Sequence, residues 1–247
     1  MQKLWFSLYD FSFDYKGTEP SYIEPKSLRF TAEFEEKFPL IKTELFDYLK
    51  KNNPEAYFNA SMVNKKSIWK TISLKSWDIV FHKRQKAFPV TSALIQKYPE
   101  ITSLSFNELE AGGEILPHCG DTNGIYRCHL GIEVPASLPA CGFRVRDELR
   151  SWEEGKWLIF MDAYNHEAYN KSDKRRIIIV MDVIREEFMN QRNQITSTVL
   201  TSLFLQKRAE RLKLLYKAPE SVIRFVGKCL RPFAFMAMRF VNFVKLY

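Results

Sequence analysis

The chain has 247 residues, of which 46% are apolar and 27% charged, and its formal net charge is +8. This length fits one domain with or without an extension, and the apolar fraction excludes a disordered polyelectrolyte. Aromatic residues make up 15% of the chain, which favours a β-rich interior over a coiled coil. The four cysteines form no CxxC pair and the N-terminus lacks the apolar run of a signal peptide, so we expect a cytoplasmic protein with reduced thiols.

Two helices are predicted in the first hundred residues. Residues 32–51 carry apolar side chains at helical spacing, with acids early and lysines late: Phe34, Phe38, Ile41, Leu45 and Leu49. The stretch Phe88–Tyr98 predicts a shorter helix that enters through Pro89, is capped by Thr91 or Ser92, and ends before Pro99. Residues 1–70 are expected to be a folded lead-in that belongs to the same domain as the segment after them.

The pattern changes from about Ile101 to Val183 into short runs rich in β-branched and aromatic residues. Turn signals such as Gly112-Gly113 and Glu154-Gly155 separate these runs, which read SLSFNELEAGGEILPH, RCHLGIEVP, GFRVRDE, KWLIFMDAY and RRIIIVMDV. Short strands at this spacing predict a sandwich or open barrel. We therefore expect a β core over residues 71–185, with helices on both sides of it.

The net charge is concentrated in the last part of a predicted helical extension, residues 186–247. Between Ser221 and Tyr247 there are five cations and no acid, so residues 1–220 carry only 8 − 5 = +3. A basic footprint spread over a nucleic-acid-binding face is therefore not expected. The longest uncharged run in this tail, Pro232–Met238, is far shorter than the roughly 20 residues that span a membrane.

Two interpretations of the tail 221–247 stay open. In the first, it forms a helix that packs on the core and is broken at Pro232. In the second, its alternating apolar and basic residues lie in a bilayer interface beside anionic headgroups. The second interpretation would place the protein peripherally at the inner face of the membrane.

Histidine is scarce, and three of the four histidines fall inside the strand-rich segment: His118, His129 and His166. Imidazoles at the ends of different strands can build a metal site in the mouth of a barrel. On spacing alone, a hydrogen-bonded structural histidine is the commoner situation. His82 has no assigned role.

Four ordered segments, PHCGDTN, YRCHLGIEVP, SWEEGKWLIFMDAYNHEAYN and RRIIIVMD, resemble the aspartyl/asparaginyl β-hydroxylase family of iron(II)/2-oxoglutarate dioxygenases. The resemblance covers about residues 70–185. It implies a mainly β core, a double-stranded β-helix or jelly-roll barrel, flanked by N- and C-terminal helices. It also implies a hydroxylase that oxidises an unactivated C–H bond with Fe(II), 2-oxoglutarate and O2 and releases succinate and CO2.

The same resemblance implies roles for individual residues. His118 and His166 match the iron ligands of the family, with Gly120 in the place of the acid of an HxD motif. Arg176 matches the arginine that pairs with the distal carboxylate of 2-oxoglutarate, a task that suits a guanidinium fork. Arg175 would exchange roles with Arg176 if the strand register slipped by one residue.

Further positions are expected to bind cosubstrate or substrate. His129 resembles the residue beside the C1 carboxylate of 2-oxoglutarate, and Arg127, on the same strand face, is expected to contact cosubstrate, substrate or both. Asn107 stands where a serine often holds the distal carboxylate, and its amide can donate a hydrogen bond there. Trp152 is expected to be a packing aromatic at a hairpin.

The substrate class stays open between a peptide, an amino-acid-like molecule and a lipid. Ile125 stands where peptide-hydroxylating relatives often have a second arginine, which weakens a peptidyl-aspartate assignment. The family also includes bacterial hydroxylases of lipid acyl chains, and a basic, phenylalanine-rich tail would suit work at a membrane surface. A non-catalytic binding module on the same fold is the alternative from another functional class.

Overall fold

The computed structural model describes residues 3–10, 15–57, 59, 62–65, 68–209 and 218–246. One antiparallel sheet contains β1 (Tyr22–Ile23), β2 (Glu55–Ala56), β3 (Trp69–Ser76), β4 (Ile79–Val80), β5 (Ile101–Leu109), β7 (Ile125–Glu133), β10 (Trp157–Phe160) and β12 (Arg176–Ile184). A smaller antiparallel sheet contains β6 (Gly113–His118), β8 (Cys141–Val145), β9 (Glu148–Arg150) and β11 (His166–Asn170).

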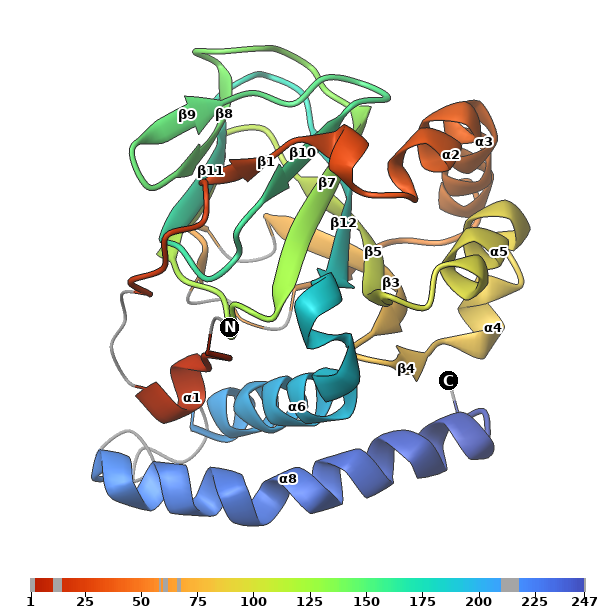
Figure 1. Ribbon diagram of the computed structural model, residues 1–247. Helices are drawn as coiled ribbons and strands as arrows, with labels where there is room; N and C mark the ends of the chain where they lie inside the picture. The colour runs from red at the N-terminus through yellow and green to blue at the C-terminus, as the bar shows by residue number, and fades with distance from the viewer. Residues whose placement is uncertain are drawn as a thin grey trace.

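The chain winds alternately between these two sheets. Strands β5, β7, β10 and β12 belong to the large sheet, in the order β1-β10-β7-β12-β5-β3-β2, with β4 paired to β3. Strands β6, β8 and β11 lie between them in sequence but belong to the small sheet, whose order is β6-β11-β8-β9. This winding is the double-stranded β-helix that the resemblance implies (Figure 1).

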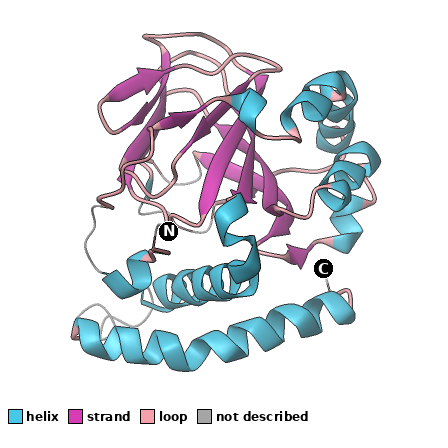
Figure 2. Ribbon diagram, in the orientation of Figure 1, coloured by secondary structure: helices cyan, strands magenta, loops and turns pink. Residues whose placement is uncertain are grey.

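Side chains alternate between the two faces of each central strand, so the interior consists of two layers. On β7, Arg127 and His129 face the space between the sheets, whereas Cys128, Leu130 and Ile132 belong to the core on the other face. That second core packs under α2 (Thr31–Glu36), α3 (Phe38–Leu49) and α5 (Pro89–Lys97). Figure 2 shows these helices together on one side of the strands.

The predicted N-terminal helices are present, with two local differences. The segment 32–51 forms two helices that meet at Lys37, because Pro39 lacks an N–H and fits only the first turn of a new helix. Helix α5 occupies the predicted range, but neither Thr91 nor Ser92 caps it. The carboxylate of Glu44 on α3 instead accepts hydrogen bonds from the backbone N–H groups of Val90 (2.5 Å) and Thr91 (3.1 Å).

The C-terminal part forms two long helices below the sheets (Figure 1). After the 3-10 turn Glu186–Gln191, α6 (Arg192–Ala209) packs Ile195 and Val199 against the ends of β7 and β12. Helix α8 (Glu220–Phe243) then packs on α6. It continues through Pro232, so the predicted break is wrong. Pro232 is exposed, and the backbone carbonyl that loses its partner there can bond to water.

None of the described helices combines the length and the apolarity needed to cross a membrane. The remaining short helices are α1 (Ser7–Asp10), the 3-10 turn Pro25–Ser27 and α4 (His82–Gln85), which contains His82.

Candidate functional site

A cavity between the two sheets is lined by all six residues that the sequence nominated. These residues come from five strands: Asn107 (β5), His118 (β6), Arg127 and His129 (β7), His166 (β11) and Arg176 (β12). The cavity shares Trp69, His118 and Arg127 with a larger groove of about 650 Å³ that runs toward α6. The nominated residues therefore form one site between the two sheets, next to this groove.

His118 and His166 are a cross-strand pair at the edge of the small sheet. They lie opposite each other in the β6–β11 register, so their side chains share one face and their ring centroids are 4.2 Å apart. His118 Nδ1 lies 2.7 Å from the Leu116 carbonyl oxygen, and His166 Nδ1 lies 2.8 Å from the Tyr164 carbonyl oxygen. Because a carbonyl only accepts, both Nδ1 atoms carry the proton and both Nε2 atoms hold a lone pair.

Burial keeps this pair neutral. It lowers the pKa of His118 to about 4 and holds the pKa of His166 well below its usual value of 6.5. Two neutral imidazoles with fixed Nδ1–H groups are the form in which histidine binds a transition metal. The donor set therefore fits an iron(II) ion bound by two histidines. Within the described part of the chain, no group of three or more His, Cys, Asp or Glu side chains is arranged as a metal site.

Gly120 leaves room for a carboxylate that comes from elsewhere in the chain. A Cβ atom at Gly120 would lie 1.8 Å from Asp162 Oδ2 and 2.7 Å from the Asp162 carbonyl oxygen. The Gly120 N–H also donates to that carbonyl oxygen (2.8 Å). Asp162, only 1% exposed, thus fills the space that a side chain at position 120 would need, with its Oδ1 3.7 Å from His166 Nε2.

Arg127 holds two carboxylates rather than pointing freely into the cavity. Its Nη1 lies 2.7 Å from Asp162 Oδ1, and its Nε donates to Asp182 Oδ1 (2.7 Å). Burial raises the pKa of Asp162 to about 7, although the neighbouring Arg127 charge opposes this shift. Sequence reasoning missed both aspartates. The signal available for Asp162 was its place four residues before His166.

Arg176 differs from Arg127 because its charge has no carboxylate partner among the residues that the structure describes. The residue is 1% exposed, and its Nε and Nη1 atoms have no hydrogen-bond partner among the described residues. The guanidinium carbon lies 4.3 Å from the Trp152 ring, which gives a cation–π contact. Burial lowers the pKa of Arg176 to about 9, so the group is still charged at neutral pH. A buried fork of this kind is suited to an anionic ligand.

The structure separates Arg176 from its neighbour Arg175. The Arg175 side chain is 38% exposed and lies near Glu108 (3.1 Å) and Glu133 (3.3 Å) on the outer face of the strand. The one-residue slip considered for this strand is therefore absent, and Arg176 is the arginine that faces the cavity.

Trp152 fixes the protonation of His129, which goes beyond the packing role expected for it. Its Nε1–H donates to His129 Nδ1 at 3.2 Å. An indole only donates, so His129 Nδ1 accepts and the ring proton sits on Nε2. Burial, with the charges of Arg176 and Arg127, holds the pKa of His129 well below 6.5. His129 is therefore a neutral Nε2–H donor within the cavity.

Asn107 is buried and lines the cavity, with its amide already engaged. Its Oδ1 accepts a hydrogen bond from Trp69 Nε1 (3.0 Å), and its Nδ2 donates to Ser105 Oγ (2.8 Å). Nδ2 also donates to the Ser105 carbonyl oxygen (3.4 Å), so both of its hydrogens have an acceptor within the protein. A role for Asn107 toward the distal carboxylate stays a prediction.

Both a protein-family model and individual known proteins match this sequence. A model of the family described as aspartyl/asparaginyl beta-hydroxylase matches residues 35–186. The chain is 34% identical over 174 residues to the ornithine lipid ester-linked acyl 2-hydroxylase of Rhizobium tropici, covering 68% of this chain and 62% of that protein. It is 34% identical over 114 residues to human aspartyl/asparaginyl beta-hydroxylase, covering 44% of this chain and 15% of that protein. The chain thus spans less than two thirds of either relative.

Among solved structures, similar chains are more distant. A predicted oxalate decarboxylase from Thermotoga maritima has a TM-score of 0.38 and 10% identity, over 55% of this chain and 96% of its own. A cupin 2 conserved barrel domain protein from Salinispora arenicola has a TM-score of 0.34 and 9% identity, over 56% of this chain and 87% of its own.

Proposed function

Because the chain belongs to the aspartyl/asparaginyl β-hydroxylase family, we propose that it is a hydroxylase that depends on Fe(II) and 2-oxoglutarate. The observation that carries this proposal is the buried guanidinium of Arg176, whose Nε and Nη1 lack partners among the described residues, in the cavity that holds two neutral histidines. An anionic cosubstrate would supply the counter-charge that the described residues do not.

Different side chains of the cavity would bind the metal and 2-oxoglutarate. His118 and His166 would hold the metal through Nε2, since each Nδ1–H is committed to a backbone carbonyl. Arg176 would bind the distal carboxylate of 2-oxoglutarate with two parallel hydrogen bonds, and the Nε2–H of His129 would donate to its C1 carboxylate. Bound Fe(II) would supply O2 activation coupled to the conversion of 2-oxoglutarate into succinate and CO2.

The ion pairs of Arg127 with Asp162 and Asp182 would hold the side chains of this site in position. Arg127 fixes Asp162 beside His166, and Asp182 anchors Arg127 from β12. With its charge already balanced by two carboxylates, Arg127 is a weaker candidate than Arg176 for gripping a further anion. We assign it a positioning role toward Asp162.

For the substrate we favour the acyl chain of a lipid, with a peptide as the second candidate. The Rhizobium relative, which matches more of this chain than the human one, is named for hydroxylating an acyl chain. Beside its polar side chains, the groove next to the cavity also has aromatic and aliphatic ones in its walls: Trp5, Tyr57, Met62, Trp69 and Leu203. Such walls suit an apolar chain that leads toward the metal position.

Turnover with candidate substrates tests the proposal. The full chain, loaded with Fe(II), is incubated in air with 2-oxoglutarate and either long-chain acyl lipids or peptides containing Asp and Asn. Mass spectrometry then measures succinate and substrate that has gained one oxygen atom. We expect stoichiometric succinate and oxygenated lipid, with both lost in Arg176→Met and retained in Arg175→Met, the matched change on the outer face. Oxygenation of the peptide alone would reverse the choice of substrate. Folded, iron-loaded protein that forms no succinate would overturn the proposal.

A further inference from the structure

Helix α8 is held against the body of the protein along one side only. It packs on α6, α1 and β4, and Gly227 and Met238 are the residues of this helix that are buried. At its C-terminal end, Asn242 accepts from the Val80 N–H (2.9 Å) and donates to the Asp78 carbonyl oxygen (2.8 Å). These two bonds tie the helix to the β3–β4 connection and fix which side faces outward.

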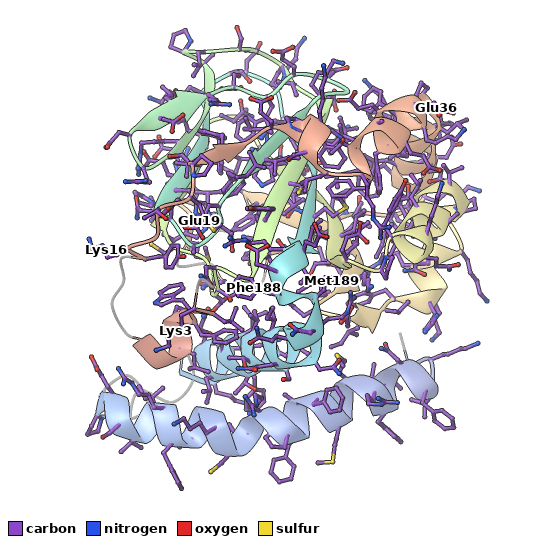
Figure 3. The ribbon with its side chains drawn as sticks, in the orientation of Figure 1. Lys3, Lys16, Glu19, Glu36, Phe188 and Met189 are labelled. Carbon is purple, nitrogen blue, oxygen red and sulfur yellow. The ribbon has the colours of Figure 1, made fainter. Side chains whose placement is uncertain are left out.

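The side of α8 that faces away from the body is apolar. Six residues, which we name the α8 outer face, are exposed there: Val222, Phe225, Phe233, Met236, Phe240 and Phe243. At 3.6 residues per turn they fall within an arc of about 80°, opposite Gly227 and Met238. The four phenylalanines are each exposed by between 64% and 86%. Figure 3 shows side chains projecting from this edge of the molecule.

An exposed apolar stripe of this length indicates a binding surface, and the flanking charge indicates what binds there. Lys228 and Arg239 lie on one flank of the outer face by helical rotation, whereas Arg224 and Arg231 are turned toward the body, with Arg224 3.7 Å from Glu220. No acidic residue between Ser221 and Tyr247 balances Lys228 and Arg239. A second copy of the helix would present the same positive charge. A partner with an apolar interior and an anionic surface complements both features.

We propose that the α8 outer face binds the surface of an anionic lipid bilayer. The phenylalanine rings enter the boundary between headgroups and acyl chains, and the flanking cations lie at the level of the lipid phosphates. Because α8 packs on α6, which contributes Leu203 and Gln206 to the groove, docking would hold the groove one helix layer above the bilayer. The proposal does not depend on the hydroxylase activity, since it concerns binding alone.

The experiment is flotation of the full chain with vesicles of phosphatidylcholine, with and without 30% phosphatidylglycerol. We expect binding to the anionic vesicles, weakened by raising NaCl from 0.1 M to 0.5 M. Phe233→Gln/Phe240→Gln should weaken binding by about tenfold or more, because two inserted rings are lost. Lys228→Gln/Arg239→Gln should weaken it by about fivefold for each cation removed.

The matched control is Leu40→Gln/Leu149→Gln, which removes two exposed leucines from α3 and β9. This variant should bind as the wild type does, and all variants should keep the wild-type unfolding temperature because the changed side chains are exposed. Two results would overturn the proposal. One is wild-type protein that does not bind anionic vesicles, or binds equally well after Phe233→Gln/Phe240→Gln. The other is a wild-type dimer that ignores vesicles and becomes monomeric in that variant, which would make the face an interface between copies.

Discussion

Arg176 keeps a full positive charge inside the barrel at a cost to the stability of the ligand-free protein. Its guanidinium has the face of Trp152 on one side, but its Nε and Nη1 atoms have no partner among the described residues. A cation–π contact offsets only part of the cost of burying a charge. We therefore expect an anionic ligand that binds Arg176 to stabilise the folded protein.

Replacing Arg176 by methionine should raise the stability of the protein and abolish its binding of 2-oxoglutarate. The apolar side chain fills a similar volume without a charge, so we expect the free energy of unfolding of the ligand-free protein to rise by about 1–3 kcal/mol. Binding of 2-oxoglutarate should be lost in the same variant. Chemical denaturation and calorimetric titration measure the two quantities. A variant that is less stable and still binds 2-oxoglutarate would show that Arg176 is a structural residue.

The stability difference between these two proteins should also depend on pH. The pKa of Arg176 is about 9 in the folded protein, below its ordinary value of 12.5. Above pH 9 the unfolded chain binds more protons than the folded one, so this group makes wild-type stability rise with pH. The advantage of Arg176→Met should therefore be constant up to about pH 8 and shrink toward pH 10.5. Denaturation curves for both proteins across that range give the comparison.

Gly120 is required by the position of Asp162. Gly120→Ala should lower the free energy of unfolding by about 1–3 kcal/mol, because the added Cβ overlaps both Asp162 Oδ2 and the Asp162 backbone. Combining it with Asp162→Ala in a double-mutant cycle isolates the side-chain part of this clash. The double variant should lose less stability than the sum of the two single changes, and strict additivity would contradict the geometry.

Trp152→Phe tests whether the indole N–H determines which ring nitrogen of His129 carries the proton. Without the Nε1–H, His129 can move its proton to Nδ1 and turn a lone pair toward the cosubstrate carboxylate. We expect 2-oxoglutarate to bind about tenfold more weakly, as the loss of one hydrogen bond predicts. Trp157→Phe is the matched control, since its Nε1 donates to the Thr31 carbonyl oxygen on the opposite face of the sheet. Equal losses of affinity in both variants would refute the role of Trp152.

The histidines, arginines and the asparagine that line the cavity were predictable, but their supporting contacts were not. The ordered motifs nominated His118, His166 and Arg176 through the family resemblance, and the structure brings them into one cavity. Asp162 and Trp152 were missed in their roles because the contacts that define those roles join residues far apart in sequence or across two strands. The pairing of Arg127 with two aspartates depends on strand register, which the sequence does not show.

At the scale of elements, helix α5 is capped by Glu44, a residue of a different helix. Its carboxylate accepts from two N–H groups in the first turn of α5 and also from the Thr91 hydroxyl (2.7 Å). Glu44→Ala should lower the free energy of unfolding by about 1–2 kcal/mol, as loss of a cap and of a favourable charge at a helix N-terminus. Glu36→Ala, which removes an exposed ion pair, should change it by less than about 0.5 kcal/mol. Similar small changes in both would contradict the capping role.

Strands that contribute polar side chains to the lining of the groove were harder to predict. On β3, Thr71, Ser73 and Lys75 line the groove while Ile72 and Leu74 are buried, so the apolar signal is reduced to two residues. Strand β11 is five residues long and begins with His166 itself. Both strands were missed because polar residues that line the site take up many of their positions and shorten the apolar pattern that indicates a strand.

At the scale of the whole molecule, composition and period indicated a β core between helices, but the alternation of strands between two sheets came from the family resemblance. Non-local pairing sets that alternation, and residues close in sequence carry little information about it. The tail shows a related effect. Packing on the core and contact with a bilayer were treated as alternatives, yet α8 packs on α6 with one side and exposes apolar residues on the other.

The most direct test of the hydroxylase assignment is an anaerobic titration of the full chain with Fe(II) and then 2-oxoglutarate, monitored by visible absorption. The wild type should develop the charge-transfer band of metal-chelated 2-oxoglutarate. His166→Ala should lose the band, Arg176→Met should require much more 2-oxoglutarate, and Arg175→Met should behave as the wild type. Folded wild-type protein that shows no band, or a band unchanged in His166→Ala, would contradict the account.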